Sequence, residues 1–276
     1  MAIVYDFDGT LAPGNVQERQ FIPDIGMTPE EFWKGVNDLV EKHQADGTLM
    51  YMYEMLRRAG NAEVPVRRED FGSRTQDIEL FEGVPQWFDR INGYGRAVGV
   101  HVDHYIVSSG NAEIIEGTPI AHNFTGIYAS KFLFDQNGVA VWPALAINYT
   151  TKTQYLFRIN KGAHDLSDDT AINRYVEKKD RPVPFENMVY IGDGVTDVPC
   201  FRLVKDQGGL SIAVYQADAG GAKEEAEVFV REGRVQSAVP ANYRESSDLD
   251  LLVHDYIKLV SAREALARRA PHIGVP

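Results

Sequence analysis

The chain has 276 residues, of which 44% are hydrophobic, a composition typical of globular proteins. This length allows one sizeable α/β domain and a smaller one, with a core that needs no disulfide or metal. The formal net charge of -12 disfavours binding to nucleic acid or to an anionic membrane surface. A small anionic substrate would therefore need a local positive site.

The single cysteine, Cys200, excludes an intramolecular disulfide and a cysteine-rich zinc site. A reducing cytoplasm agrees with this cysteine usage. Met1 leads directly into an apolar run that is too short for a signal peptide or a membrane span. We therefore expect a cytoplasmic protein that binds neither membranes nor nucleic acid, whereas its oligomeric state is not predicted.

Short apolar runs that end in Asp, Ser or Gly recur along the chain and predict buried parallel strands. Open α/β sheets place their ligand sites at the carboxyl ends of such strands. The predicted strands cover residues 3–5, 105–107, 188–191 and 210–215.

Helical patterns lie between these strands and predict an α/β fold with a doubly wound, Rossmann-like parallel sheet. Asp168 or Asp169 is a candidate N-cap for one of the helices. The polar segment 217–242 gives no prediction. The predicted helices cover residues 85–91, 153–159, 169–176 and 249–260.

The segment 14–80 interrupts this alternation of strands and helices. Thr28-Pro29-Glu30-Glu31 is typical of a helix start, and the stretch to Arg58 consists mostly of helix-forming residues. We interpret 14–80 as a small helical cap domain inserted into an α/β core domain of residues 1–13 and 81–276. Gly14 and the turn at 83–85 are candidate edges or hinges of the insert.

The first polar motif, Asp6-Phe7-Asp8-Gly9-Thr10, directly follows a predicted strand. Asp6 can attack phosphorus as a carboxylate nucleophile, and Asp8 can protonate the leaving oxygen and then activate water. A calcium loop is excluded, because Gly9 and Thr10 stand where further ligands are required and a strand precedes the motif. The competing interpretation is a pair of aspartates that only close the strand in a turn.

The second polar motif is Gly192-Asp193-Gly194-Val195-Thr196-Asp197, again after a predicted strand. A dinucleotide-binding loop is disfavoured because Asp197 stands where Gly or Ala is needed for close helix packing. Asp6, Asp8 and Asp193 together offer hard oxygen ligands for Mg2+. A cation is required because these carboxylates alone would repel a phosphate.

With these motifs in this order, the chain resembles the haloacid dehalogenase-like hydrolase superfamily, within its phosphatase branch. The resemblance implies that Asp6 is the nucleophile and Asp8 the general acid and base, with the backbone carbonyl of Asp8 as its metal ligand. An acid at Asp8 argues for phosphoryl transfer over dehalogenation. The resemblance covers residues 1–214 apart from the insert.

The resemblance also implies a strand-end serine that hydrogen-bonds the transferring phosphoryl group. Ser108, followed by Ser109, takes this position, and neighbouring backbone amides would assist. Taken alone, a Ser-Ser-Gly turn is more often only a loop, so this assignment depends on its place between the two aspartate motifs.

A lysine that opens a helix is the remaining family motif, and Lys152 is our choice, with Lys161 as the reserve. Such a lysine neutralises the phosphate and steadies Asp6. Asp197 is expected to support Lys152 or a metal-bound water and not to bind the metal directly.

Other conspicuous residues are interpreted as structural. His101 and His104 lack the spacing and the adjacent glutamate of a zinc protease. Cys200 has no identifiable base beside it, and the run 50–53 is interpreted as core in preference to a substrate pocket. Four arginines that could recognise an anionic substrate end are interpreted as solvated: Arg57, Arg58, Arg67 and Arg68.

The resulting hypothesis is a Mg2+-dependent phosphomonoester hydrolase that forms an aspartyl phosphate on Asp6. The modest size of the insert predicts a small phosphorylated metabolite as substrate. A phosphomutase with the same aspartates is the nearest alternative. A non-catalytic phosphate-binding protein on the same fold is the alternative from another class.

Overall fold

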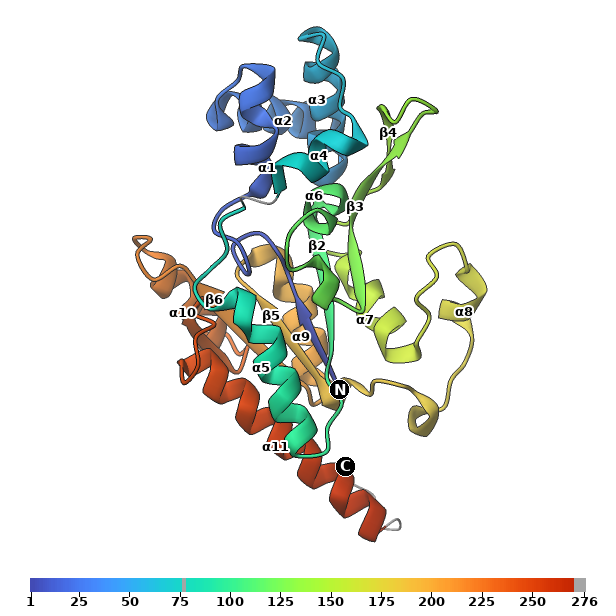
Figure 1. Ribbon diagram of the computed structural model, residues 1–276, viewed down its shortest axis with the longest axis vertical. Coiled ribbons are helices and arrows are strands. Elements are labelled where there is room, and N and C mark those ends of the chain that lie inside the picture. Colours follow the sequence, from blue (N-terminus) through green and yellow to red (C-terminus); the bar gives the residue numbers. More distant parts are fainter. Residues whose placement is uncertain (76–77, 271–276) are drawn as a thin grey trace.

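The computed structural model describes residues 1–75 and 78–270, and its described part is built around a seven-stranded sheet (Figure 1). The strand order is β4-β3-β2-β1-β5-β6-β7. Only the β3–β4 pair is antiparallel among the strands described. The strands are β1 (Ala2–Tyr5), β2 (Asp103–Asn111), β3 (Gly126–Phe134), β4 (Ala140–Leu145), β5 (Met188–Gly192), β6 (Leu210–Tyr215) and β7 (Ser237–Pro240).

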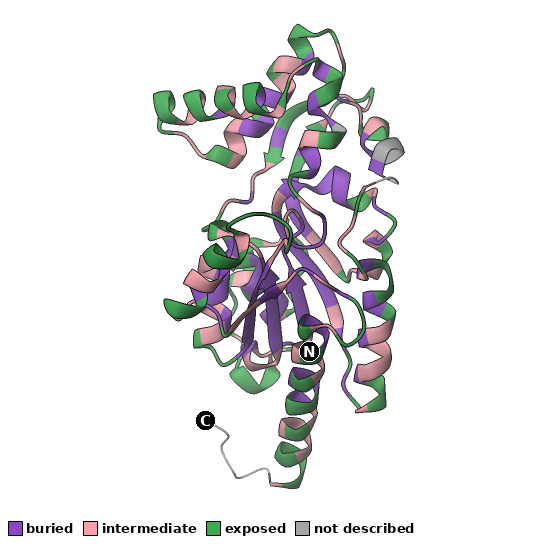
Figure 2. Cartoon of the chain, turned by 90° about the vertical axis from the view of Figure 1, so that its left-hand side faces the viewer, coloured by how far each residue is buried: buried purple, intermediate pink, exposed green. Residues whose placement is uncertain are grey.

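Helices cover both faces of this sheet, as alternate side chains of β1 demonstrate. Ile3 and Tyr5 belong to a core shared with α5 and α11, whereas Ala2 and Val4 belong to a second core shared with α7 and α9. The central strands are accordingly buried along their length (Figure 2). This arrangement confirms the predicted α/β, Rossmann-like fold. The helices outside the segment 14–80 are α5 (Val84–Ala97), α6 (Ala112–Glu116), α7 (Lys152–Lys161), α8 (Asp169–Asn173), α9 (Val198–Asp206), α10 (Ala222–Arg231) and α11 (Asp248–Arg269), with short 3-10 turns at η3 (Ala121–Asn123), η4 (Lys178–Asp180), η5 (Phe185–Asn187) and η6 (Val195–Asp197).

The predicted helix over 169–176 is too long, because α8 ends at Asn173 and Arg174 is extended. Its start is confirmed, since the Asp168 side chain accepts hydrogen bonds from the backbone N–H groups of Thr170 and Ala171. Lys161, the reserve for the family lysine, donates instead to two backbone carbonyls at the end of α8. The segment 217–242, which gave no prediction, contains α10 and β7.

The segment between β1 and α5 is helical, and Figure 1 shows it at the upper end of the molecule. The predicted start at Thr28 is confirmed by a capping box with Glu31. The helical stretch to Arg58 is not continuous, because Gln44 is left-handed and Asp46 caps a new helix. Its elements are α1 (Val16–Gln20), η1 (Ile22–Ile25), α2 (Pro29–His43), α3 (Gly47–Asn61) and α4 (Arg68–Arg74).

The β3–β4 hairpin contacts this helical segment directly. The Ala140 N–H donates to the Val66 carbonyl at 2.8 Å, and the Arg68 N–H donates to the Gly138 carbonyl at 3.0 Å. The hairpin comes from the predicted core domain, so the two predicted domains share backbone pairing. Their boundaries stay a prediction.

Three residues interpreted from the sequence as structural or solvated have specific partners, namely His104, Arg57 and Arg58. His104 is buried; its Nδ1 lies 2.9 Å from the Tyr5 hydroxyl and its Nε2 lies 3.1 Å from the Asn92 side-chain oxygen. The buried Glu54 carboxylate pairs with both Arg57 and Arg58, which corrects the interpretation of these arginines as merely solvated.

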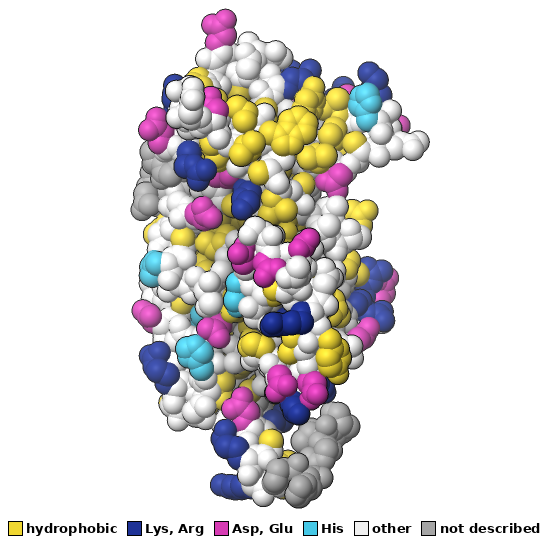
Figure 3. Space-filling model, turned by 90° about the vertical axis from the view of Figure 1, so that its right-hand side faces the viewer, with side chains coloured by type: hydrophobic (Ala, Val, Ile, Leu, Met, Phe, Trp, Pro, Cys, Tyr) yellow, Lys and Arg dark blue, Asp and Glu magenta, His cyan; other side chains and the backbone are white. Residues whose placement is uncertain are grey.

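The described helices include none long and apolar enough to cross a membrane. Figure 3 shows charged side chains of both signs scattered over one face of the molecule, with hydrophobic side chains gathered in its upper part. The β3–β4 hairpin contributes exposed hydrophobic residues, namely Leu133, Val141 and Trp142.

Candidate active site

The polar motifs meet because they lie at or near the carboxyl ends of three neighbouring strands. β1 lies between β2 and β5, and Tyr5 is in register with Ile106 on one side and Ile191 on the other. Parallel strands in register end at the same edge of the sheet, so Asp6, Ser108 and Asp193 come together there. The Asp6 N–H also continues the ladder to the Ile191 carbonyl at 2.9 Å.

Lys152 is the fully buried cation at the centre of this group. It begins α7, and its Nζ donates to Asp6 Oδ2 at 2.6 Å and to Asp197 Oδ1 at 2.7 Å. Burial opposes the charge of the ammonium, but Asp197 and Asp6 outweigh burial and raise the pKa of Lys152. Of the two lysines considered from the sequence, Lys152 thus lies beside Asp6 and Lys161 does not.

Both carboxylate oxygens of Asp197 accept hydrogen bonds. Its Oδ1 also accepts a hydrogen bond from the Tyr190 hydroxyl at 2.7 Å, and its Oδ2 accepts from the backbone N–H groups of Asp193 and Gly194, both at 3.2 Å. The carboxylate therefore ties Lys152 to the loop that carries Asp193. Tyr190 was not singled out from the sequence, although a tyrosine among the aliphatic residues of a buried strand was a usable signal.

The carboxylates of Asp193 and Asp6 lie close together. Together with Asp197 they offer oxygen atoms that all lie within 4.8 Å of one another. Burial and the charges of Asp197 and Asp6 raise the pKa of Asp193 well above its usual range. Crowded buried carboxylates of this kind are stabilised by a bound cation, and their oxygen donors suit Mg2+.

The predicted metal ligands were Asp6, Asp8 and Asp193, and within the described residues the carboxylate group holds Asp197 in place of the Asp8 side chain. Asp197 accepts hydrogen bonds from four donors, namely Lys152, Tyr190 and the N–H groups of Asp193 and Gly194, so Asp6 and Asp193 are the better candidates for metal ligands.

Gly9 permits the close approach of the two aspartate loops. It has a left-handed backbone with φ of +70°, and a Cβ added there would overlap the Asp193 carboxylate. The neighbouring Thr10 hydroxyl donates to Asp193 Oδ1 at 3.4 Å. The first motif therefore places its glycine and its threonine against the second.

Asp8 is held away from Asp6 by the start of the helical segment. Its Oδ1 accepts a hydrogen bond from the Val16 backbone N–H at 2.9 Å. Burial raises the pKa of Asp8 to about 7, and the bond from Val16 opposes that rise. A carboxyl group with this pKa can donate a proton near neutral pH and then accept one.

Ser108 and Ser109 lie at the same edge of the sheet. The buried Ser108 hydroxyl accepts a hydrogen bond from the Gly110 N–H at 3.1 Å and contacts Asp6. The Ser109 carbonyl accepts from the Tyr51 hydroxyl at 2.8 Å, so a residue interpreted as core also reaches the site. A cavity of about 420 Å³ is lined by Asp6, Asp8, Ser108, Ser109, Asp193 and Thr196, among others.

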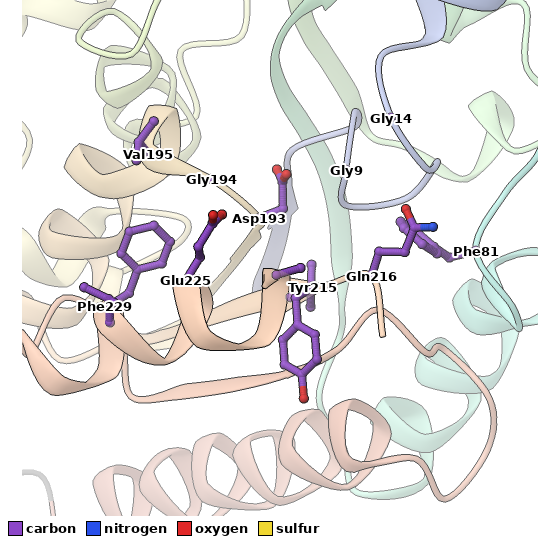
Figure 4. Close-up of a pocket in the computed structure, with 13 residues that line it drawn as sticks. Gly9, Gly14, Phe81, Asp193, Gly194, Val195, Tyr215, Gln216, Glu225 and Phe229 are labelled. Atoms are coloured by element: carbon purple, nitrogen blue, oxygen red, sulfur yellow. The ribbon is translucent and has the colours of Figure 1, made fainter. Parts of the chain in front are cut away.

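A larger cavity of about 590 Å³ adjoins the Asp193 loop on the side of α10. Figure 4 shows Asp193 and Gly9 on one side of it and Glu225 and Phe229 of α10 on the other. Its lining includes Gly9 and Asp193 but neither Asp6 nor Asp8.

Residues 3–202 match the model of the haloacid dehalogenase-like hydrolase family, and the chain belongs to that family. This confirms the resemblance inferred from the motifs. An uncharacterized protein of Borreliella burgdorferi is 28% identical over 277 residues, which cover 90% of this chain and 93% of that protein.

Solved structures with a similar fold include hydrolases of this family. A HAD family hydrolase from Salmonella enterica serovar Typhi superimposes with a TM-score of 0.56 at 16% identity, covering 92% of this chain and 69% of that one. A substrate-bound phosphoserine phosphatase gives a TM-score of 0.51 at 17% identity, covering 82% and 90% of the two chains. At such identities the likeness shows the fold.

Proposed function

We propose that this protein is a Mg2+-dependent phosphomonoester hydrolase that works through a phosphoryl group transiently bound to Asp6. The observation that carries the proposal is the Asp6 carboxylate, buried at a strand end and held by Lys152, with Asp8 lining the same cavity. A nucleophile and an acid with a pKa near neutrality are the two groups that this chemistry requires.

The first step joins an Asp6 carboxylate oxygen to phosphorus while the bond between phosphorus and the ester oxygen breaks. Asp8 gives its proton to the departing alcohol. In the second step Asp8 takes a proton from water as the water oxygen attacks phosphorus, and the bond to Asp6 breaks, which releases inorganic phosphate. Lys152 and the Ser108 hydroxyl stabilise the charge on the phosphoryl oxygens, with backbone N–H groups near Ser109 assisting.

A magnesium ion held by Asp6, Asp193 and the Asp8 carbonyl would neutralise charge on the phosphate and the carboxylates. The chain's own residues support this proposal, since burial and crowding make the Asp193 carboxylate costly to ionise without a cation. Asp197 orients Lys152 and the Asp193 loop and is not proposed as a ligand.

The structural likeness to phosphatases supports the reaction class. One of the similar folds is a phospho-aspartyl intermediate analogue of phosphoserine phosphatase, with a TM-score of 0.51 at 15% identity. We further propose that the segment 14–80 acts as a cap and that the substrate is a small phosphorylated metabolite of the cytoplasm.

The test is the release of inorganic phosphate from a panel of phosphomonoesters, with Mg2+ and with EDTA. We expect metal-dependent release that is abolished in Asp6→Asn and strongly reduced in Asp8→Asn. The matched control is Asp255→Asn, because Asp255 is an exposed residue of α11 that pairs only with Lys258 in the described structure.

Phosphate release by purified Asp6→Asn would refute the nucleophile. Isomerised substrate without release would favour a phosphomutase. Binding of phosphate without any turnover would favour the non-catalytic protein.

A further inference from the structure

A third cavity, of about 300 Å³, lies beside Asp8 on the side of α2 and α3, and we call it the cap-side cavity. Asp8 lines both this cavity and the one around Asp6, whereas the large cavity beside α10 lacks Asp8. A general acid must reach the oxygen that it protonates. The alcohol of a bound phosphomonoester therefore extends into the cap-side cavity.

The described lining of the cap-side cavity offers no cationic partner for an anion. It contains the carboxylates of Asp8 and Asp46 and the side-chain amides of four residues, but no lysine or arginine among the described residues that line it. The nearby arginines of α3, Arg57 and Arg58, are both held by Glu54. An anionic alcohol would enter a site whose fixed charges are negative.

A further carboxylate lies directly behind the cavity wall. Glu18 Oε1 accepts hydrogen bonds from Asn15 Nδ2 at 2.8 Å and from Trp33 Nε1 at 2.7 Å, and both donors line the cavity. Asp46 is held in the same manner by the neutral Asn148 side chain at 2.6 Å. Within the described part of the chain, no lysine or arginine pairs with Glu18 or Asp46, so their charges act on the cavity.

The buried side-chain oxygen of Gln17 requires a hydrogen-bond donor. The Gln17 side chain is 3% exposed, it lines the cap-side cavity, and its Oε1 has no hydrogen-bond partner among the described residues. A buried amide oxygen without a donor is costly. A hydroxyl or ammonium group on the alcohol can supply that donor, and a carboxylate cannot.

We infer that the protein selects phosphomonoesters whose alcohol bears hydrogen-bond donors and no negative charge, and that it discriminates against alcohols bearing a carboxylate or a second phosphate. This inference rests on the proposed function. It assigns Gln17, Asp46 and Glu18 to substrate selection, the first as an acceptor and the other two through their charge.

Two matched substrate pairs test the inference, because the members of each pair differ in one anionic group. O-phosphoethanolamine is compared with O-phosphoserine, and glycerol 3-phosphate with 3-phosphoglycerate. We expect kcat/KM to be at least about tenfold higher for the first member of each pair, which corresponds to about 1.4 kcal/mol. Equal values, or a preference for the carboxylates, would overturn the inference.

A variant that introduces a positive charge makes the same test inside the cavity. Asn37 is exposed, lies on α2 and lines the cap-side cavity, so Asn37→Arg brings a cation to it. We expect the preference against O-phosphoserine to shrink at least about fivefold. The control is Asn61→Arg at the exposed end of α3, outside the cavity lining, where the ratio should not change.

Acetyl phosphate, whose acyl group is small and uncharged, distinguishes failure of the inferred substrate selection from failure of the proposed function. Turnover of acetyl phosphate with an unchanged ratio in Asn37→Arg would refute the inference and leave the proposed function standing. Absence of Mg2+-dependent turnover of acetyl phosphate and of all four esters would refute the proposed function, and the inference with it.

Discussion

Lys152→Met removes an ammonium that is fully buried between two carboxylates, while it keeps a side chain of similar length. Lys152 has no exposed surface and contacts Asp6 Oδ2 at 2.6 Å and Asp197 Oδ1 at 2.7 Å. The methionine leaves both carboxylates buried without their cation. Asp197 keeps its bonds from Tyr190, Asp193 and Gly194, so much of the new cost falls on Asp6.

Breaking a buried ion pair by removing one partner typically costs about 3–5 kcal/mol. Domains are usually stable by about 5–15 kcal/mol, so the variant should fold but unfold at much lower denaturant. The chain supplies its own control in Lys161→Met. Lys161 donates only to the carbonyls of Ile172 and Arg174 at the partly exposed end of α8, so its loss should cost about 1–2 kcal/mol and leave catalysis intact.

The measurement is urea unfolding at pH 7.5, followed by circular dichroism, together with phosphatase activity. Lys152→Met should lose activity and at least about 3 kcal/mol of unfolding free energy. The double variant Lys152→Met/Asp197→Asn should recover part of that stability, because one unpaired carboxylate is gone. A loss below about 1 kcal/mol in Lys152→Met, or an equal loss in Lys161→Met, would refute the reasoning.

Two further predictions concern backbone and pH. Gly9→Ala and Gly99→Ala both strain a left-handed residue by about 1–2 kcal/mol. Only the Gly9 methyl overlaps Asp193, so activity should fall in Gly9→Ala alone, and full activity in Gly9→Ala would contradict the close approach. Burial lowers the pKa of His104 from 6.5 to about 3. The neutral ring therefore contributes its full stabilisation above pH 6.5. As the pH drops from 6.5 toward 3, the free energy of unfolding falls by up to about 1.4 kcal/mol per pH unit. Urea titrations between about pH 7.5 and 4.5 should show that His104→Asn flattens this decline, and an unchanged slope would exclude His104 as its cause.

The local signals in the sequence predicted local structure well. The apolar runs before Asp6 and Gly192 form β1 and β5, and the caps at Thr28 and Asp168 start α2 and α8. Each of these depends on residues within a few positions of one another. The strands β3, β4 and β7 were not predicted: β4 and β7 each contain a proline, β7 has only four residues, and Ser130 and Lys131 interrupt the apolar run of β3.

Long-range contacts escaped the sequence reasoning. Arg57 and Arg58 look like surface residues in sequence, and only the packing of α3 buries the Glu54 that binds them. The contact of Asp46 with Asn148 likewise joins residues 102 positions apart.

The sequence by itself determined which chemical groups stand at the strand ends, because each aspartate motif directly follows the apolar run that forms its strand. The tertiary structure decided how those groups act. It brings Lys152 to Asp6 across 146 positions. It raises the pKa of Asp8 to about 7 and places that residue against the cap-side cavity. Burial, charge and distance between remote segments set these properties, and none of them is encoded in a local pattern.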